Sequence, residues 1–566
     1  MLQTSARSAT LQRTAWSALR GRSPPNQMEL HGANILGGES SRSGSTTFRG
    51  VNPATGAALE PAYYEATEAE IDRALALADQ AFAAYRKTPP AEIARFLEAI
   101  AAGLENLGAE LIARARAETA LPEPRLLGER ARTAGQLRMF AALVREGSWL
   151  DARIDRGDPA RTPVPKPDMR RMLAPMGPVV IFGASNFPLA FSVCGGDTAS
   201  ALAAGNPIVV KGHPAHPSTS EMAARVLQEA VRACGMPAGT FSMVQGPSPA
   251  VGLALVRHPL ARAVGFTGSL GAGRALFDAA AARPVPIPLF AEMGSINPVF
   301  VLPGALKSRG SAVAQSMAKS VTLGVGQFCT KPGVALGLRG PEFDAFTETL
   351  SREISQSPAA TMLHAGIAEH YRNGLGKRRR ISGIHVAGSA VADSASAAPA
   401  QSNEKSASAF AAVFKADAQL FRDEPSLSEE LFGPATLVVP CESKQRLEEI
   451  ASNLAGQLTV TIQATEDDLK EFASLIDILR EKAGRLVFGS MPTGLEVGPA
   501  TQHGGPYPAT TDPRFTSVGT AAILRFVRPV CFQDFPQAWL PPELKDENPS
   551  GIARMVDGAW TRDPIS

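Results

Sequence analysis

Apolar residues recur three and four positions apart between about Ala66 and Arg145, and this spacing predicts a series of amphipathic helices. Thr67 and Glu70 have the spacing of a capping box at the start of the first helix. Beyond residue 171 the pattern changes to short, continuous apolar runs, typical of buried strands, that are separated by helical segments. The chain therefore has a helical first part and an alternating second part.

The alternating part predicts an α/β fold with a parallel sheet, because strands and helices follow one another in turn. Strands are expected over residues 177–182, 206–211, 241–245 and 261–266. Helices are expected over residues 199–204 and 220–233. A second α/β run begins near Asn297.

Three stretches interrupt this pattern. Residues 151–171 are rich in proline and charge, which indicates an excursion from the main body, and residues 387–408 have the low complexity of a surface loop. Residues 1–27 carry four arginines and no acidic residue, which resembles a mitochondrial transit peptide. The alternative, a tail ahead of a working start at Met28, is the one we favour. We therefore expect a cytoplasmic protein, or a mitochondrial matrix protein if residues 1–27 are a targeting peptide.

Composition argues against several classes of protein. A net charge of +2 over 566 residues argues against a dedicated nucleic-acid-binding protein, which carries a basic stripe or domain. The five cysteines are scattered without paired spacing, so we expect a reducing compartment and neither a disulfide framework nor a metal site. No apolar run approaches the length that spans a bilayer, so no membrane partner is expected.

One cysteine lies in an unusual setting. Cys329 belongs to the segment VGQFCTKPG, which is rich in turn-forming residues. Glycine permits a sharp bend and a close backbone approach, and an exposed nucleophile needs both. An inert cysteine packed at the start of a helix is the alternative, and for an arbitrary chain it is the more common case.

Four further features follow expected strands, where ligands bind in open α/β sheets. They are Asn186 in GASNFP, Lys211, the glycine loop of residues 268–273 and Glu292 in AEMG. Each has a plain structural explanation: a turn for Asn186, a solvated charge for Lys211 and a buried ion pair for Glu292. The loop spacing GxxGxG also departs from the dinucleotide fingerprint. Together with Cys329, and in this order, the four features favour a catalytic site.

Six blocks in this order resemble the aldehyde dehydrogenase superfamily, from about Met28 to Arg528. They are GASNFP, NPIVVK, VGFTGS, AEMGSINP, GQFCTKPG and EELFGP. The blocks FPLAFSVCGGDTASALAAGNPIVVKGHPAHPSTSE and ATQHGGPYPATTD look like the branch that contains 2,5-dioxovalerate (α-ketoglutaric semialdehyde) dehydrogenases. The NADP-linked fatty aldehyde dehydrogenases are close relatives of that branch.

The resemblance implies an α/β fold with two Rossmann-like domains and a small β flap for oligomerisation. The implied division is a dinucleotide-binding domain over residues 28–150 and 172–293, a catalytic domain over 294–500, and a flap with a C-terminal tail over 151–171 and 501–566. A flap strand is expected near residues 523–528. The family habit implies a homodimer or homotetramer.

The resemblance also implies catalytic roles. Cys329 would attack the aldehyde to give a thiohemiacetal, which becomes a thioester after oxidation. The Asn186 amide and the Cys329 backbone N–H would stabilise the oxyanion. Glu292 would activate the water that hydrolyses the thioester.

The implied cofactor is NADP or NAD, and five residues match its contacts. Lys211 would hold the adenosine ribose, Gly268 and Ser269 would lie near the pyrophosphate, and Glu430 and Phe432 would hold the nicotinamide ribose and ring. NAD-preferring members often have an acid where this chain has Pro214. The missing acid favours NADP, unless a more distant acid folds back to the ribose.

The expected substrate is a small aldehyde, with 2,5-dioxovalerate first and long-chain or other aliphatic aldehydes as the alternative. A coenzyme-A-acylating enzyme is a rival, but Glu292 argues against it because such relatives usually lack this acid. A non-catalytic protein that kept the fold is a rival from another class, and the joint presence of Cys329, Asn186 and Glu292 argues against it. A carboxylate substrate requires a basic residue in the pocket, and the sequence does not identify one.

Overall fold

The structure, a computed structural model, describes residues 28–389 and 407–565. The expectations for residues 1–27 and for most of the low-complexity segment fall outside these ranges. Within them, no helix is long and apolar enough to cross a membrane.

The first of two large sheets holds all four strands that the apolar runs predict. Its order is β11-β10-β7-β8-β9-β1-β2. The five parallel strands are β7 (Val179–Phe182), β8 (Ile208–Lys211), β9 (Phe241–Val244), β10 (Ala263–Thr267) and β11 (Leu289–Glu292). The antiparallel strands β1 (Asn34–Leu36) and β2 (Glu39–Ser41) close one edge. The α/β prediction is confirmed.

Helices cover both faces of this sheet, because alternate strand residues point to opposite sides. Ile181 and Val210 pack in one core cluster with helices α3 (Pro90–Asn106), α5 (Glu123–Glu146), α6 (Gly196–Ala203) and α7 (Pro217–Ala233). Val180 and Val209 pack in another with α2 (Glu68–Tyr85), α8 (Pro249–Arg257) and α9 (Leu270–Ala281). Helix α4 (Gly108–Thr119) lies beside α5 and α7.

The capping box at the start of α2 forms as predicted. The Glu70 backbone N–H donates to the Thr67 hydroxyl at 3.2 Å, and the Thr67 backbone N–H donates to the Glu70 carboxylate at 2.9 Å.

The second sheet has the order β15-β17-β18-β13-β12-β19-β20. Its strands are β12 (Val299–Val301), β13 (Val334–Leu338), β15 (His385–Ser389), β17 (Ala412–Lys415), β18 (Ala435–Cys441), β19 (Gln457–Gln463) and β20 (Ala483–Phe488). Its helices are α10 (Pro303–Thr322), α11 (Pro341–Ser355), α12 (Ala365–Arg379), α13 (Ala418–Asp423), α14 (Lys444–Asn453), α15 (Glu466–Glu471) and α16 (Ala473–Arg480). All strands except β15 run parallel to their neighbours, so the second α/β run forms a unit of its own.

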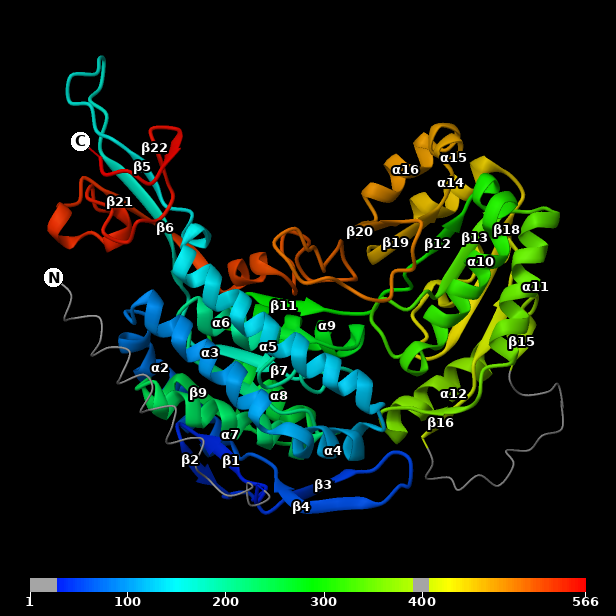
Figure 1. Cartoon of the computed structure of the whole chain (residues 1–566), viewed down its shortest axis with the longest axis horizontal. Helices are drawn as coiled ribbons and strands as arrows, with labels where there is room; N and C mark the ends of the chain where they lie inside the picture. Colours follow the sequence, from blue (N-terminus) through cyan, green and yellow to red (C-terminus); the bar gives the residue numbers. More distant parts are fainter. Residues whose placement is uncertain (1–27, 390–406, 566) are drawn as a thin grey trace, which may run out of the picture.

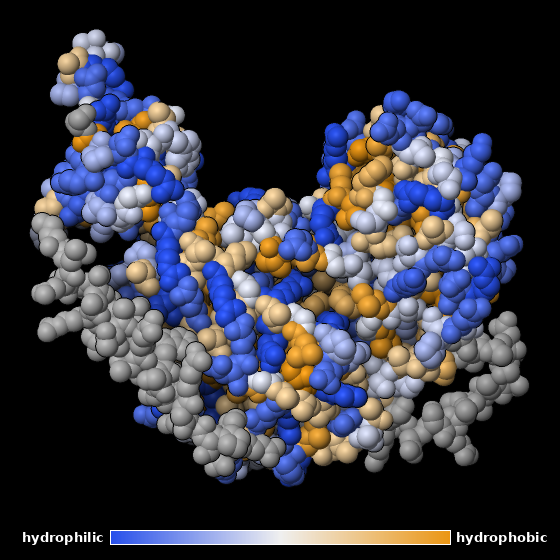
Figure 2. Space-filling view, in the orientation of Figure 1, coloured by the Kyte–Doolittle hydropathy of each residue, from blue (hydrophilic) through white to orange (hydrophobic). Residues whose placement is uncertain are grey.

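A third, five-stranded sheet projects from the first unit (Figure 1). Its order is β21 (Val527–Gln533), β6 (Met169–Pro175), β5 (Arg153–Asp155), β22 (Arg554–Val556) and β23 (Ala559–Thr561). Two small antiparallel pairs complete the fold: β3 (Thr47–Val51) with β4 (Ala58–Tyr64), and β14 (Ala360–Thr361) with β16 (Ser408–Ala409). Figure 2 shows a hollow between the projecting five-stranded sheet and the second unit.

The expectation of a strand near residues 523–528 is wrong for most of its length. Thr520–Phe526 forms a 3₁₀ helix, and the strand begins only at Val527. The reason is local packing on α6: Arg525 makes an ion pair with Asp197 at 2.7 Å, and Ile523 joins the core. These contacts favour a tight turn over an extended strand.

Candidate active site

Cys329 lies on a loop of unusual backbone conformation between α10 and β13. Gly324, Val325 and Gly326 all have positive φ angles, of 55°, 58° and 66°. Gly326 also packs against the loop before β18, where a Cβ at Gly326 would lie 2.3 Å from the Gly433 carbonyl carbon. Only glycine allows both the turn and this close approach. The glycines around Cys329 thus bring the cysteine loop against the EELFGP loop.

Two asparagines contact this cysteine loop. The Asn297 side chain donates to the carbonyl oxygens of Cys329 at 2.8 Å and of Lys331 at 3.1 Å, which fixes the backbone on either side of Thr330. The Asn186 side chain donates to the Gln327 carbonyl oxygen at 3.1 Å. The structure thus brings Asn186 to the loop that carries Cys329.

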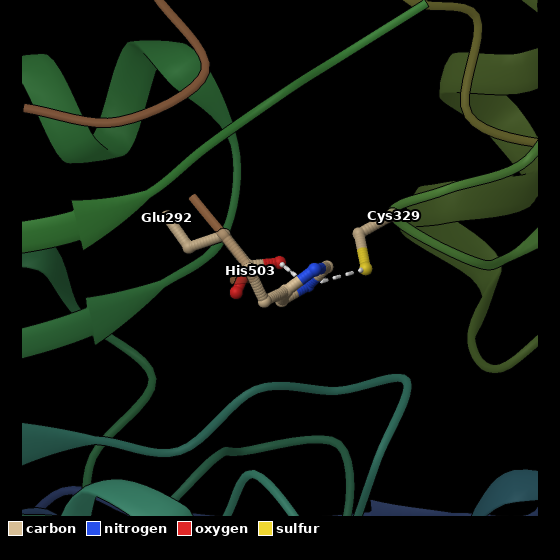
Figure 3. Close-up of side chains that lie close together, drawn as sticks. All are labelled: Glu292, Cys329 and His503. Carbon is tan, nitrogen blue, oxygen red and sulfur yellow. Dashed lines mark hydrogen bonds and ion pairs between the residues drawn. The ribbon is translucent and has the colours of Figure 1, made fainter. Parts of the chain in front are cut away.

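A histidine lies between Cys329 and Glu292 (Figure 3). The His503 Nε2 atom is 3.5 Å from the Cys329 Sγ atom and 2.9 Å from the Glu292 Oε1 atom. The Ser517 hydroxyl donates to the other oxygen of Glu292 at 2.6 Å. Both contacts are made by Nε2, so the ring can take a proton from the sulfur only when its own proton is on Nδ1.

A segment that follows β20 delivers His503. It returns from the second unit to the edge strand β11, where the Met293 N–H donates to the Ala509 carbonyl at 2.8 Å and the Thr511 hydroxyl donates to the Leu289 carbonyl at 2.6 Å. Gly484 allows this path, because a Cβ there would lie 2.2 Å from the Gly504 carbonyl oxygen. The segment therefore lies in both units and places His503 between them.

Burial and neighbouring groups set the charge of the acid and the thiol. Burial raises the pKa of Glu292, but the His503 ring and the hydrogen bonds from His503, Ser517 and Cys329 outweigh it and hold the pKa below its usual value. Burial and the nearby Glu292 carboxylate raise the pKa of Cys329 well above its usual value. The resting site therefore holds a carboxylate and a protonated thiol, and the thiol requires a base.

The same three side chains could hold a metal ion, since their ligand atoms all lie within 4.8 Å of one another. Cysteine, histidine and carboxylate are zinc ligands in proteins. The expectation that no metal binds therefore stays a prediction.

The residues expected at the adenosine end of a dinucleotide lie at the carboxyl edge of the first sheet. Lys211 ends β8, and burial lowers the pKa of its ammonium to about 8, against the opposing charge of Glu65. Gly268 follows β10, and Ser269 is the N-cap of α9. The buried Thr267 hydroxyl has no hydrogen-bond partner among the described residues. An unsatisfied hydroxyl, a lysine and a helix N-terminus fit an anionic, hydroxylated ligand such as a dinucleotide.

The residues expected at the nicotinamide end lie on the EELFGP loop. Burial raises the pKa of Glu430 to about 7, against the opposing charge of Lys331, and Phe432 is partly buried two residues further on. The Lys331 ammonium donates to the carbonyls of Leu431 at 3.1 Å and Ala435 at 2.9 Å. Lys331 thus holds both ends of the segment that carries Phe432.

Two features of this site escape prediction from the sequence. His503 stands in the block ATQHGGPYPATTD, which marks a branch of the family but gives no chemical role. Its distance of 174 positions from Cys329 hides the contact. Glu65 is the other, because an acid from the segment after β4 reaches the vicinity of Lys211.

Comparisons with known proteins identify the family. The model of the aldehyde dehydrogenase family matches residues 40–480. The chain belongs to this family. It is 49% identical to alpha-ketoglutaric semialdehyde dehydrogenase 2 of Azospirillum brasilense, over 94% of this chain and 99% of that protein. It is 44% identical to alpha-ketoglutaric semialdehyde dehydrogenase of Acinetobacter baylyi, again over 94% and 99%.

The fold of this chain also matches solved structures. The NAD⁺ complex of aldehyde dehydrogenase from Bacillus cereus superposes with a TM-score of 0.75 at 22% identity, covering 90% of this chain and 99% of that one. The expected aldehyde dehydrogenase-like α/β fold is confirmed.

Proposed function

We propose that this aldehyde dehydrogenase oxidises 2,5-dioxovalerate to 2-oxoglutarate with a nicotinamide dinucleotide, using Cys329 as the nucleophile. The observation that carries the catalytic part is the Cys329–His503–Glu292 series, with contacts of 3.5 Å and 2.9 Å. The names of the two relatives at 49% and 44% identity support the substrate, since both cover nearly the whole chain.

His503 acts first, as the base that the raised pKa of the Cys329 thiol makes necessary. With the proton of the neutral ring on Nδ1, the Nε2 atom accepts the thiol proton, and the Nε2–H of the resulting imidazolium then donates to the Glu292 carboxylate. The sulfur then forms a bond to the aldehyde carbon, and the carbonyl oxygen takes the negative charge. The Asn186 amide and the Cys329 backbone N–H stabilise this thiohemiacetal oxyanion, and losing one such donor costs about 10²- to 10³-fold in rate.

When bound, the nicotinamide cofactor would accept a hydride from the thiohemiacetal carbon, and the acyl group would then remain on the Cys329 sulfur as a thioester. Lys211, Gly268 and Ser269 would hold its adenosine and pyrophosphate part, while Glu430 and Phe432 would hold the nicotinamide part. Water must then attack the thioester carbon to release the acid. Glu292 lies beside the thiol and has a lowered pKa, so we assign the water's proton to the Glu292 carboxylate.

We propose that the enzyme uses NADP at least as readily as NAD. Pro214 leaves no acid three residues after Lys211, so the repulsion that excludes a 2′-phosphate is absent there. Glu65 is the acid that could replace it, but its two oxygens accept bonds from the backbone and side chain of Ser248, at 3.2 and 2.8 Å.

We also propose a homodimer or a homotetramer. Among the terminal strands of the three large sheets, β20 and β21 have outer edges with no strand partner in the described chain. Unpaired edges of this kind pair readily with another chain. The bacterial origin of both relatives supports the cytoplasm as the location.

The test is a spectrophotometric assay of the purified protein with 2,5-dioxovalerate, succinic semialdehyde, glycolaldehyde and a long-chain aldehyde, each with NADP and NAD. We expect the highest kcat/KM with 2,5-dioxovalerate, and 2-oxoglutarate as the product without coenzyme A. Reduction that requires coenzyme A would identify an acylating enzyme instead. Absence of turnover with every aldehyde would contradict the proposed activity.

A further inference from the structure

Cys329 opens into a cavity of about 360 Å³ whose walls are aromatic and basic. This is the size range of small-molecule sites. Its aromatic lining comes from Phe187, Phe191 and Phe328, and its basic lining comes from Arg125 and Arg132. His503 also borders it, so the cavity leads directly to the sulfur and its base.

Helix α5 forms the basic wall through residues that share one helical face. Arg125, Gly128, Glu129 and Arg132 are three, four and seven positions apart, and all four line the cavity. Gly128 leaves this face open, because a Cβ there would have no neighbour within 4 Å.

The protein already uses the other charged groups on this wall. Arg125 donates to the Asn186 carbonyl at 2.9 Å and lies 3.7 Å from the Glu129 carboxylate. Its guanidinium lies 4.6 Å and 4.5 Å from the ring centres of Phe187 and Phe328. Glu129 also accepts backbone N–H bonds from Leu189 and Ala190. Arg125 therefore supports the loop that carries Asn186.

Arg132 differs from Arg125. Within the part of the chain that the structure describes, no hydrogen bond or ion pair engages its guanidinium, and its buried Nε atom has no partner. Its guanidinium lies over the faces of Phe187 and Phe191, at 5.6 Å and 5.5 Å, and it feels the charge of Glu129 and Glu292 without bonding either. A partly buried cation without a partner is costly, so such a group indicates an anion that binds from outside the chain.

We propose that Arg132 is the residue that binds the substrate's carboxylate while the aldehyde carbon lies at Cys329. This inference rests on the proposed function and adds the recognition of a semialdehyde acid. The planar guanidinium can donate two parallel bonds to one carboxylate, and the phenylalanines around it exclude water and strengthen that contact. The aldehyde and the carboxylate are at opposite ends of 2,5-dioxovalerate, and Cys329 and Arg132 both line one cavity.

The test compares 2,5-dioxovalerate with pentanal, which has the same chain length and no carboxylate. Arg132→Met removes the charge and keeps much of the side-chain length. Arg130→Met is the matched control, because Arg130 is on the same helix but donates to the Gly108 carbonyl at 2.6 Å and does not line the cavity. The measurement is the ratio of kcat/KM for the two aldehydes.

We expect Arg132→Met to lower this ratio by roughly 10- to 100-fold, the value of a hydrogen-bonded charge, mainly through KM for 2,5-dioxovalerate. Arg130→Met should keep the wild-type ratio. Equal loss with both aldehydes would overturn the inference, because Arg132 would then act on the fold or on Cys329. An unchanged ratio in Arg132→Met would also overturn it.

Wild-type enzyme and a second variant keep the test decisive if Arg132→Met does not fold. Arg132→Lys keeps the charge without the two-pronged geometry, so its ratio should fall between those of wild type and total loss. Wild type that oxidises pentanal as well as 2,5-dioxovalerate would overturn the assignment of Arg132 and leave aldehyde oxidation intact. Wild type that oxidises neither would instead contradict the proposed function.

Discussion

The two large sheets contribute to the site from opposite ends of their strands. In the first sheet, the candidate residues end strands: Lys211 ends β8 and Glu292 ends β11. In the second sheet, the candidate residues precede strands: Cys329 lies before β13 and Glu430 lies before β18. The carboxyl edge of one sheet thus faces the amino edge of the other, with the cavity between them.

In the proposed mechanism, this difference separates cofactor binding from nucleophilic attack. The carboxyl edge of a parallel sheet offers helix N-termini and strand-end side chains, which suit a dinucleotide. The amino edge of the second sheet offers loops, and the Cys329 loop needs three left-handed residues to reach its place. His503 belongs to neither edge: it comes from the segment that returns from β20 to β11, and it links the acid of one sheet to the thiol of the other.

The largest effect should follow from removing the nucleophile of the second sheet. Cys329→Ala should lower kcat by roughly 10⁴-fold or more, as loss of a covalent nucleophile does in other enzymes. Cofactor binding by the first sheet should persist, which a fluorescence titration with NADPH can check. Cys234→Ala, another partly buried cysteine, is the control and should keep full activity. Substantial turnover by Cys329→Ala would show that the sulfur is not the attacking atom.

Breaking the link between the sheets should have the next largest effect. His503→Gln should lower kcat/KM by roughly 10²-fold or more at pH 7, the contribution of a general base. Because the pKa of the Cys329 thiol is raised, its thiolate fraction without His503 grows as pH rises toward that pKa. The deficit should therefore shrink with increasing pH, in a profile from pH 6 to 10.

The His503→Gln measurement needs a control histidine outside the site. His258→Gln serves as the control, because His258 bonds Asp72 on the surface at 3.2 Å, away from the cavity. A deficit in His503→Gln that stays the same at every pH would argue that His503 only holds the fold.

Neutralising the acid of the first sheet should separate the two chemical steps. Glu292→Gln keeps the size of the side chain but cannot accept the water's proton, so hydrolysis of the thioester should become slow. Stopped-flow absorbance should show a burst of reduced cofactor followed by a steady rate lower by about 10²-fold. An unchanged steady rate would mean that another group activates the water.

The smallest effect should concern only the cofactor edge of the first sheet. An acid at position 214 would repel a 2′-phosphate, at a cost of about 1 kcal/mol or more. Pro214→Glu should therefore shift the NADP:NAD ratio of kcat/KM toward NAD by roughly 5- to 10-fold. If the native enzyme already prefers NAD by more than tenfold, Glu65 is the acid that faces the ribose, and Glu65→Gln should then reverse the preference.

The sequence pointed to candidate residues that stand in a recognisable local pattern. It missed candidate residues that reach the site through contacts between distant parts of the chain. Lys211 and Glu292 follow from apolar runs that end in a polar residue, and Cys329 follows from its glycines. His503 gives no such signal, because its role depends on a return of the chain across the molecule. Arg132 gives none either, since on α5 it resembles the other arginines of a charged helix. The tight turn at Ile523 depends on the Arg525–Asp197 ion pair, which links positions far apart in the chain.

The most direct test of the central claim is to identify the covalent intermediate. Glu292→Gln enzyme is mixed with 2,5-dioxovalerate and NADP, quenched in acid within the burst, digested and analysed by mass spectrometry. The account predicts a 2-oxoglutaryl thioester on the peptide that contains Cys329, and none when Cys329 is also replaced by Ala. A burst without this adduct, or an adduct on Cys194, Cys234, Cys441 or Cys531 instead, would contradict it.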